Sequence, residues 1–126
     1  MVPSSSPVSV IAVAEPAKRG GTVHAPGHLE VLRVRRVRHT TGGLQLLGVP
    51  ASKDSRVREV RVTFVPQGQA VPAPACDLAQ GTMDLFYPEA ERREVEQVLK
   101  QGREHLCYFW EDAHRARKRA WLMASN

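Results

Sequence analysis

The chain has few cysteines, few aromatic residues and no long apolar run. Two cysteines, Cys76 and Cys107, are too few for a disulfide framework, and reduced thiols favour a cytoplasmic protein. No apolar stretch approaches the roughly 18–20 residues that a membrane span requires. Segment 8–14 is short and apolar and has small residues as at a signal-peptide cleavage site, but no basic residue precedes it. We therefore expect neither a membrane span nor secretion.

Enzyme and metal signatures are also missing. The sequence contains no phosphate-binding glycine loop, no nucleophile elbow and no metalloprotease helix motif. His28 and Glu30 could share a strand face, yet no Cys/His spacing is typical of a zinc site. We expect no catalytic residue, no metal and no cofactor. A small hydrolase or ribonuclease that uses His105 or His114 remains the third-ranked alternative.

The residues that are abundant point to a basic globular protein. The 126 residues suit one domain, and the formal net charge is +5. Fourteen of the eighteen cationic residues are arginine. The planar guanidinium binds phosphate and stacks on bases, so this bias favours nucleic acid as a partner. A GC-rich coding sequence would produce the same bias without any such partner.

The chain divides into an N-terminal arm and one folded region. Residues 1–27 are rich in proline, serine and glycine, which indicates a mobile arm; an edge strand over 8–14 is a further option. The remaining residues, 28–126, are predicted to form a single α+β domain.

Alternating apolar and polar residues predict six strands in that domain. The proline-rich segment 66–80 is predicted to be a loop. A β-bulge is expected at Arg35–Arg36, where the alternation slips by one residue. The predicted strands are 28–39, 44–49, 57–65, 82–87, 105–111 and 117–124.

One helix of about four turns is predicted after the fourth strand. Pro88 suits the first helical position, and Gly102 suits the C-terminal cap. The final segment is predicted to be a strand hairpin, although 111–123 also contains good helix formers. A two-residue turn at His114-Arg115 would pair Tyr108 with Trp121.

The predicted fold is an antiparallel sheet of five or six strands with one amphipathic helix on one face. The order is strand-strand-strand-strand-helix-strand-strand. The predicted core residues are Leu32, Val34, Leu46, Val60, Val62, Phe64, Met83, Leu85, Val95, Val98, Leu99, Leu106, Phe109 and Leu122.

Two groups of residues suggest a function. The first is the aromatic and basic C-terminal hairpin; exposed rings on a basic sheet would stack on single-stranded bases, whereas buried rings would be core. The second is the run of arginines in the first strand, which would form a cationic stripe for phosphates. A solvated face, or ion pairs with acidic helix residues, are the alternatives for these arginines.

We therefore predict a small, non-enzymatic module that binds nucleic acid, either single-stranded or without sequence preference. The candidate binding residues are Arg33, Arg35, Arg36, Arg38, Arg61, Tyr108, Trp110, Arg117, Arg119 and Trp121. The alternative is a protein-interaction or assembly module, a homo-oligomer formed through a sheet edge or the aromatic hairpin, without nucleic-acid binding.

Overall fold

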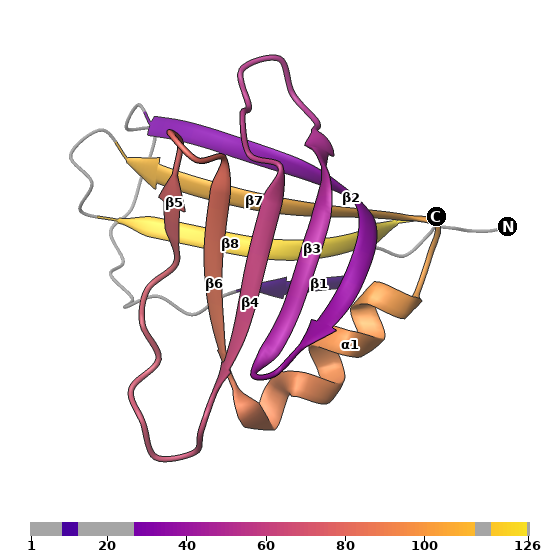
Figure 1. Ribbon diagram of the computed structural model, residues 1–126, viewed down its shortest axis with the longest axis vertical. Helices are drawn as coiled ribbons and strands as arrows, with labels where there is room; N and C mark the ends of the chain where they lie inside the picture. Colours follow the sequence, from indigo (N-terminus) through magenta and orange to yellow (C-terminus); the bar gives the residue numbers. More distant parts are fainter. Residues whose placement is uncertain (1–8, 13–26, 113–116, 126) are drawn as a thin grey trace, which may run out of the picture.

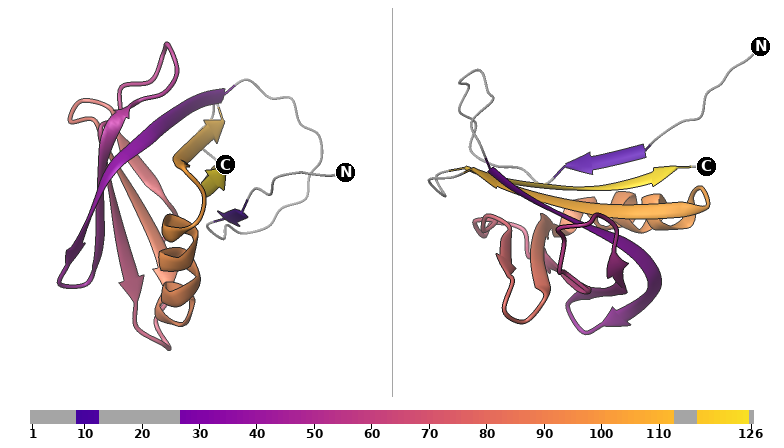
Figure 2. Two further views of the ribbon diagram at one scale, coloured as in Figure 1. Left: turned by 90° about the vertical axis from the view of Figure 1, so that its right-hand side faces the viewer. Right: turned by 90° about the horizontal axis from the view of Figure 1, so that it is seen from above.

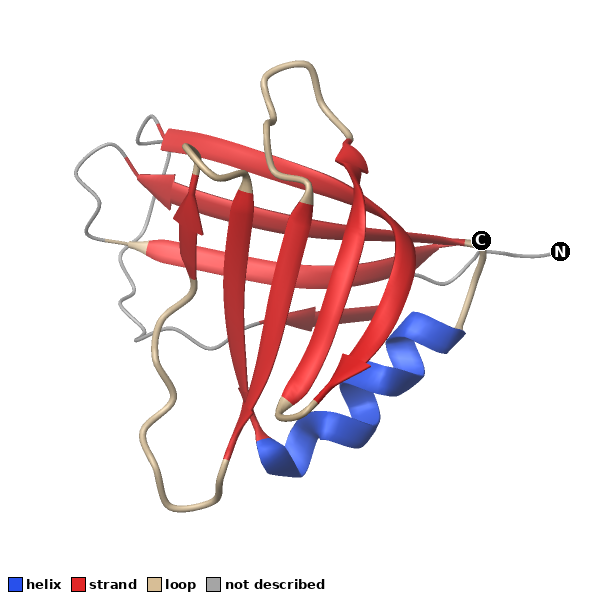
Figure 3. Ribbon diagram, in the orientation of Figure 1, coloured by secondary structure: helices blue, strands red, loops and turns tan. Residues whose placement is uncertain are grey.

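Strands form most of the protein, and a single short helix accompanies them (Figures 1 and 3). The computed structural model describes residues 9–12, 27–112 and 117–125. The predicted mobile part of the arm lies outside these ranges. The strands are β1 (Ser9–Ala12), β2 (Gly27–Thr40), β3 (Gly43–Pro50), β4 (Glu59–Val65), β5 (Ala75–Asp77), β6 (Thr82–Pro88), β7 (Glu104–Asp112) and β8 (Lys118–Ser125); the helical elements are the 3-10 turn η1 (Glu89–Glu91) and the helix α1 (Arg92–Lys100).

All eight strands belong to one sheet in the order β1-β8-β7-β2-β3-β4-β6-β5. The sheet curls on itself, so that β7 and β8 run across the back of β3, β4 and β6 in Figure 1. In the left view of Figure 2, the two halves of the sheet lie opposite each other, and α1 lies at the lower end of the molecule. The predicted α+β sheet of five or six antiparallel strands is therefore wrong, because the fold is closer to an all-β half-barrel.

The sheet is mixed because β4 and β6 are parallel. Their connection, residues 66–81, runs back along the sheet and includes β5, which pairs antiparallel with β6. Since β5 returns the chain to the end where β4 began, β6 must run in the same direction as β4. The prediction of a loop over 66–80 missed this three-residue edge strand.

Strand β2 joins the two halves of the curled sheet. Its first part, Gly27–Arg33, pairs with β7, and its second part, Leu32–Thr40, pairs with β3. A register shift lies between Val34 and Arg36, which confirms the predicted bulge. A bulge increases local twist and bends the strand, so it lies where β2 turns from one half to the other.

The helix is shorter than predicted. Pro88 precedes the 3-10 turn, and α-helical geometry begins only at Arg92. Gly102 has a φ of 69° and ends the helical region, as predicted. Val95 and Val98 are buried against the sheet, so the amphipathic helix covers the open end of the core.

The core lies between the two halves of the sheet and α1. Thirteen of the fourteen predicted core residues are buried there or pack against it at partial burial, Val34 and Leu99 being the two at partial burial. Leu106 is only half-buried, and Tyr87 and Cys107 are fully buried although the prediction omitted them. No helix in the described part of the chain is long and apolar enough to cross a membrane.

Candidate functional site

The curled sheet has two outer surfaces that differ in chemistry. Side chains alternate along each strand, so one set points to the shared core and the other points outward. Because both halves bury their inner residues in the same core, their outer faces point away from each other. We call the outer side of β3, β4 and the second part of β2 the cationic face, and the outer side of β7, β8 and the first part of β2 the aromatic face.

The cationic face is built around a row of side chains that crosses three strands. Arg38 lies opposite Gln45, and Gln45 lies opposite Arg61. Arg36 is one step away on the same side of β2, opposite Leu47. Arg36, Arg38 and Arg61 are all exposed, so β-sheet register brings together guanidinium groups that are distant in the sequence.

Two carboxylates offset the charge of this row: Glu59 lies within the cationic face, and Asp84 of β6 lies directly opposite Arg61 on the same side of the sheet. Glu59 Oε2 accepts hydrogen bonds from Gln45 Nε2 at 2.9 Å and from Arg61 Nε at 3.2 Å. The Gln45 hydrogen bond is the main cause that lowers the pKa of Glu59, and Arg61 adds to it against the opposing effect of partial burial. Glu59 is therefore ionised at neutral pH and offsets part of the charge of Arg61. An open hollow of about 310 Å³, lined partly by Thr40 and Thr63, lies beside these residues.

The aromatic face carries three of the predicted rings. Tyr108 lies opposite Trp121, and Trp110 lies opposite Arg119, which confirms the predicted strand pairing and its register. The predicted turn at His114-Arg115 lies outside the described residues. The Tyr108 and Trp121 rings are stacked, with centroids 5.1 Å apart and planes 9° apart. All three rings are half-buried on the outer side of the sheet and are not part of the core.

Trp110 owes part of its burial to a glycine on the neighbouring strand. A Cβ atom at Gly27 would lie 2.6 Å from Trp110 Nε1 and 2.6 Å from the Glu111 carbonyl oxygen. The indole therefore lies directly over the Gly27 backbone, as an aromatic side chain often does over a strand glycine. Leu29, opposite Trp110, is 41% exposed and extends the apolar area.

Charges of both signs border the aromatic face at each end. Arg33 Nε donates to Glu104 Oε2 at 2.7 Å at one end. At the other end, Asp112 Oδ1 accepts from the Arg117 backbone N–H at 3.3 Å, and exposed Arg119 lies nearby on β8. The border of the aromatic face thus carries two acids, Glu104 and Asp112, close to three arginines, and the two faces differ chiefly in the rings.

The ten predicted binding residues therefore do not form one surface. Arg36, Arg38 and Arg61 lie on the cationic face, and Arg35 is exposed at the bulge beside it. The other six belong to the aromatic face or its border: Arg33, Tyr108, Trp110, Arg117, Arg119 and Trp121. Strand β2 connects the two groups around the bend of the sheet.

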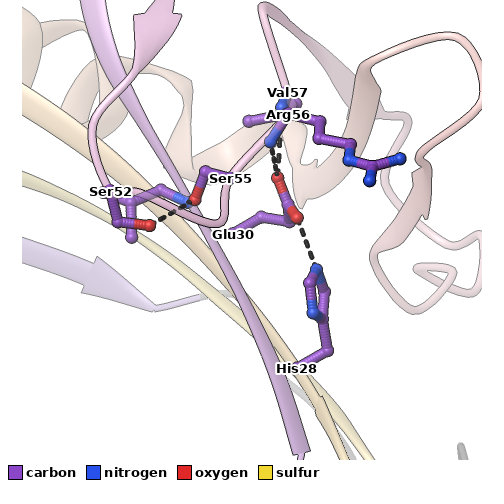
Figure 4. Close-up of polar contacts among 7 residues, drawn as sticks. His28, Glu30, Ser52, Ser55, Arg56 and Val57 are labelled. Carbon is purple, nitrogen blue, oxygen red and sulfur yellow. Dashed lines mark hydrogen bonds and ion pairs between the residues drawn. The ribbon is translucent and has the colours of Figure 1, made fainter.

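A buried carboxylate that the prediction did not use holds the junction between the two halves. Glu30 is fully buried on β2, and its Oε1 accepts from the backbone N–H groups of Arg56 at 2.7 Å and Val57 at 3.1 Å (Figure 4). His28 contacts its other oxygen. Only the alternation of β2, which places Glu30 on the inner side with Leu32, signals this role in the sequence.

The loop of residues 51–57, which contains Arg56 and Val57, continues the hydrogen bonding of β2 beyond the end of β3. The Ser55 hydroxyl accepts from the Val31 backbone N–H at 2.8 Å, and the Ala51 N–H donates to the Val31 carbonyl at 2.8 Å. The segment 51–57 is thus fixed to β2, and with it the exposed cations Lys53 and Arg56. Through these hydrogen bonds, Glu30 and Ser55 hold the loop in place at this corner of the sheet.

Both cysteines face the interior. Cys76 lies opposite Met83 on β6, and the Cys107 thiol lies 3.8 Å from the Met83 sulfur. Burial raises the pKa of each thiol to about 12, and the Glu30 carboxylate contributes to the rise at Cys76. Neither thiol is activated as a nucleophile at neutral pH.

Comparison with known proteins does not assign the chain to a family. No family model, no curated protein and no solved structure matches it. Within the described residues, no group of three or more histidine, cysteine, aspartate or glutamate side chains is arranged to hold a metal ion. The functional proposal therefore depends on the two outer faces of the sheet.

Proposed function

We propose that the protein is a small, non-enzymatic module that binds nucleic acid through phosphate contacts on the cationic face. The observation that carries the proposal is the row that places Arg38 and Arg61 on either side of Gln45, with Arg36 beside it. The two arginines are separated by two strand spacings, about 10 Å. Guanidinium groups at this separation can contact different phosphates of one strand.

The chemistry of the cationic face favours binding without sequence preference. Phosphate contacts fix position on a nucleic acid but carry no direct sequence information. The rings that could stack on bases lie on the outer side of β7 and β8, and β2 bends between them and the cationic face, so a short strand bound across Arg38 and Arg61 would not reach Trp110 or Trp121. Binding should therefore be dominated by counterion release and should weaken steeply with salt.

Fluorescence anisotropy with labelled single-stranded and duplex DNA across a salt series tests this proposal. The double variant R38A/R61A should reduce the slope of log affinity against log salt by about 1.4, since each phosphate contact on a single strand contributes about 0.7. The matched control is R93A/R103A, which removes two exposed arginines at α1 and the turn after it. Absence of binding at about 50 mM salt, or an equal loss in the control, would contradict the proposal.

We also propose that the protein acts in the cytoplasm. Cys76 and Cys107 are both free thiols inside the sheet, which suits a reducing compartment. Thiol labelling of the protein isolated under acid quench from its native cells tests this location. A disulfide recovered under those conditions would contradict it.

A further inference from the structure

We infer that the aromatic face is the surface through which two copies of this chain form a dimer. The inference concerns a different surface from the cationic face and does not depend on nucleic-acid binding. It begins from the outer side chains of the first part of β2, β7 and β8. These are mostly apolar and lie next to one another in register: Leu29, Leu106, Tyr108, Trp110, Trp121 and Met123.

The composition of this face is typical of a protein interface. Trp, Tyr, Met and Arg are enriched at interface centres, and large anchoring aromatics often supply most of the binding free energy. The stacked rings of Tyr108 and Trp121 form a preorganised centre. Because these rings are already held by each other, little side-chain entropy would be lost when a second surface covers them.

The charges around the aromatic face favour a second copy over a polyanion. Each end of the face has both signs of charge: Glu104 is paired with Arg33 at one end, and Asp112 lies near Arg117 and Arg119 at the other. The two acids weaken the attraction of this border for a polyanion, since they offset two of its three arginines. Two copies, however, can meet without net repulsion, because each end offers both signs to its counterpart.

The size of the face suits a weak dimer that forms only at high concentration. Strand β1 extends the same sheet beyond β8, so the face is four strands wide, although β1 has only four residues. At roughly 3.4 Å per residue and 4.8 Å per strand, the four segments cover about 460 Å² per subunit, which is below the range for stable specific interfaces and typical of weak ones. Two such sheets would pack face to face with their rings at the centre, related by a two-fold axis.

Sedimentation velocity of the full chain over a range of concentrations tests the inference. The 14.0 kDa wild-type chain should shift toward twice this mass as concentration rises. Leu29→Gln should weaken the dimer about tenfold or more, because a two-fold interface contains the substitution twice and each copy loses apolar burial. The matched control is Leu78→Gln, since Leu78 is 39% exposed in the turn after β5 and Leu29 is 41% exposed.

A measurement on the wild-type chain covers the case in which Leu29→Gln does not fold. The chain has two tryptophans, and both lie on the aromatic face. Quenching of tryptophan fluorescence by iodide should therefore decrease as protein concentration rises. Quenching that is independent of concentration, together with a single 14.0 kDa species, would overturn the inference.

A nucleic-acid titration of the same variants separates this inference from the proposed function. Leu29→Gln should bind the labelled single strand as the wild type does, since the cationic face is intact. If Leu29→Gln loses that binding while Leu78→Gln keeps it, the aromatic face is a nucleic-acid surface and the dimer inference is overturned. If both variants dimerise as the wild type does, the interface lies elsewhere and the inference is overturned as well.

Discussion

The two outer faces of one curled sheet differ chiefly in the stacked rings that the aromatic face carries. The cationic face presents Arg36, Arg38 and Arg61, offset by Glu59 within it and by Asp84 beside it on β6. The aromatic face presents stacked rings, with an acid close to arginine at each of its ends. Strand β2 contributes to both faces, and the bulge near Arg35 marks the change from one to the other.

This difference shows what alternation along a strand does and does not determine. Alternation decides whether a side chain points inward or outward. The curl of the sheet then decides which of the outward side chains share a surface. The outward arginines Arg36, Arg38 and Arg61 consequently lie on the opposite side of the molecule from the rings, and we assign the two faces to different partners.

The largest expected effect tests whether the aromatic face is a surface at all. Phe109 and Tyr108 are neighbours on β7, but Phe109 is 1% exposed on the inner side. Phe109→Ala should lower the free energy of unfolding by about 3–5 kcal/mol through loss of buried contacts. Tyr108→Ala should cost only about 1 kcal/mol, chiefly the stack with Trp121. Urea unfolding at low protein concentration measures both; equal losses would mean that the aromatic face belongs to the core.

The next largest effect concerns the junction that keeps the two faces in place. Glu30→Ala would leave the buried N–H groups of Arg56 and Val57 without acceptors, at a cost of about 2–3 kcal/mol. Hydrogen exchange should accelerate at these two amides in particular. Glu94→Ala on the exposed side of α1 is the control and should be nearly neutral. Unchanged exchange at Arg56 and Val57 would refute the role of Glu30.

A smaller effect is expected at the glycine beneath Trp110. Gly27→Ala would introduce a Cβ atom 2.6 Å from both the indole nitrogen and the Glu111 carbonyl oxygen, so the ring must move outward and the β2–β7 backbone must also shift. We expect a loss of about 1–2 kcal/mol and a red shift of tryptophan emission. Gly42→Ala, where a Cβ atom meets nothing within 4 Å, should produce neither change. An unshifted spectrum for Gly27→Ala would show that Trp110 does not lie over this backbone.

The cationic face should become a better phosphate-binding surface when its carboxylate is neutralised. Removing one negative charge about 10 Å from a bound phosphate is worth about 0.4 kcal/mol in water. Glu59→Gln should therefore raise affinity for a labelled single strand about twofold. Glu94→Gln on the helix should have no effect. A lower affinity for Glu59→Gln would indicate that Glu59 instead holds Arg61 in its binding position.

The smallest effect is the pH dependence of stability that Glu59 contributes. Its pKa is lowered in the folded protein, mainly by the Gln45 hydrogen bond. The folded state therefore binds this proton less readily than the unfolded state does. Glu59 therefore adds to the free energy of unfolding above its ordinary pKa of 4.5, and this addition is lost as pH falls below that value. Urea unfolding should show a smaller acid-induced loss for Glu59→Gln than for the wild type; parallel pH profiles would contradict this.

Local features of the fold could be predicted from the sequence. The alternation identified the main strands and the bulge at Arg35, and turn chemistry placed the cap at Gly102. The pairing of Tyr108 with Trp121 was predicted from an expected turn at His114-Arg115, and the register of β7 and β8 confirms the pairing. These features depend on residues close together in the chain, where periodicity and backbone preference act directly.

The features that could not be predicted depend on long-range pairing. The parallel pairing of β4 with β6 requires the chain to return along the sheet, and no residue in 66–81 signals this on its own. The curl of β2, which separates the rings from Arg38 and Arg61, depends on the partners of its two parts. The inner location of Glu30 was visible in the alternation, but its acceptors in the loop near Val57 were not.

Sedimentation of the protein with a labelled oligonucleotide tests the separation of the two faces most directly. At a protein concentration that favours the dimer, the wild type should carry the label at the mass of two chains plus oligonucleotide. R38A/R61A should still dimerise but release the label, and Leu29→Gln should carry the label as a single chain. If either folded variant loses both dimerisation and oligonucleotide binding, the account is contradicted, because one surface would then serve both partners.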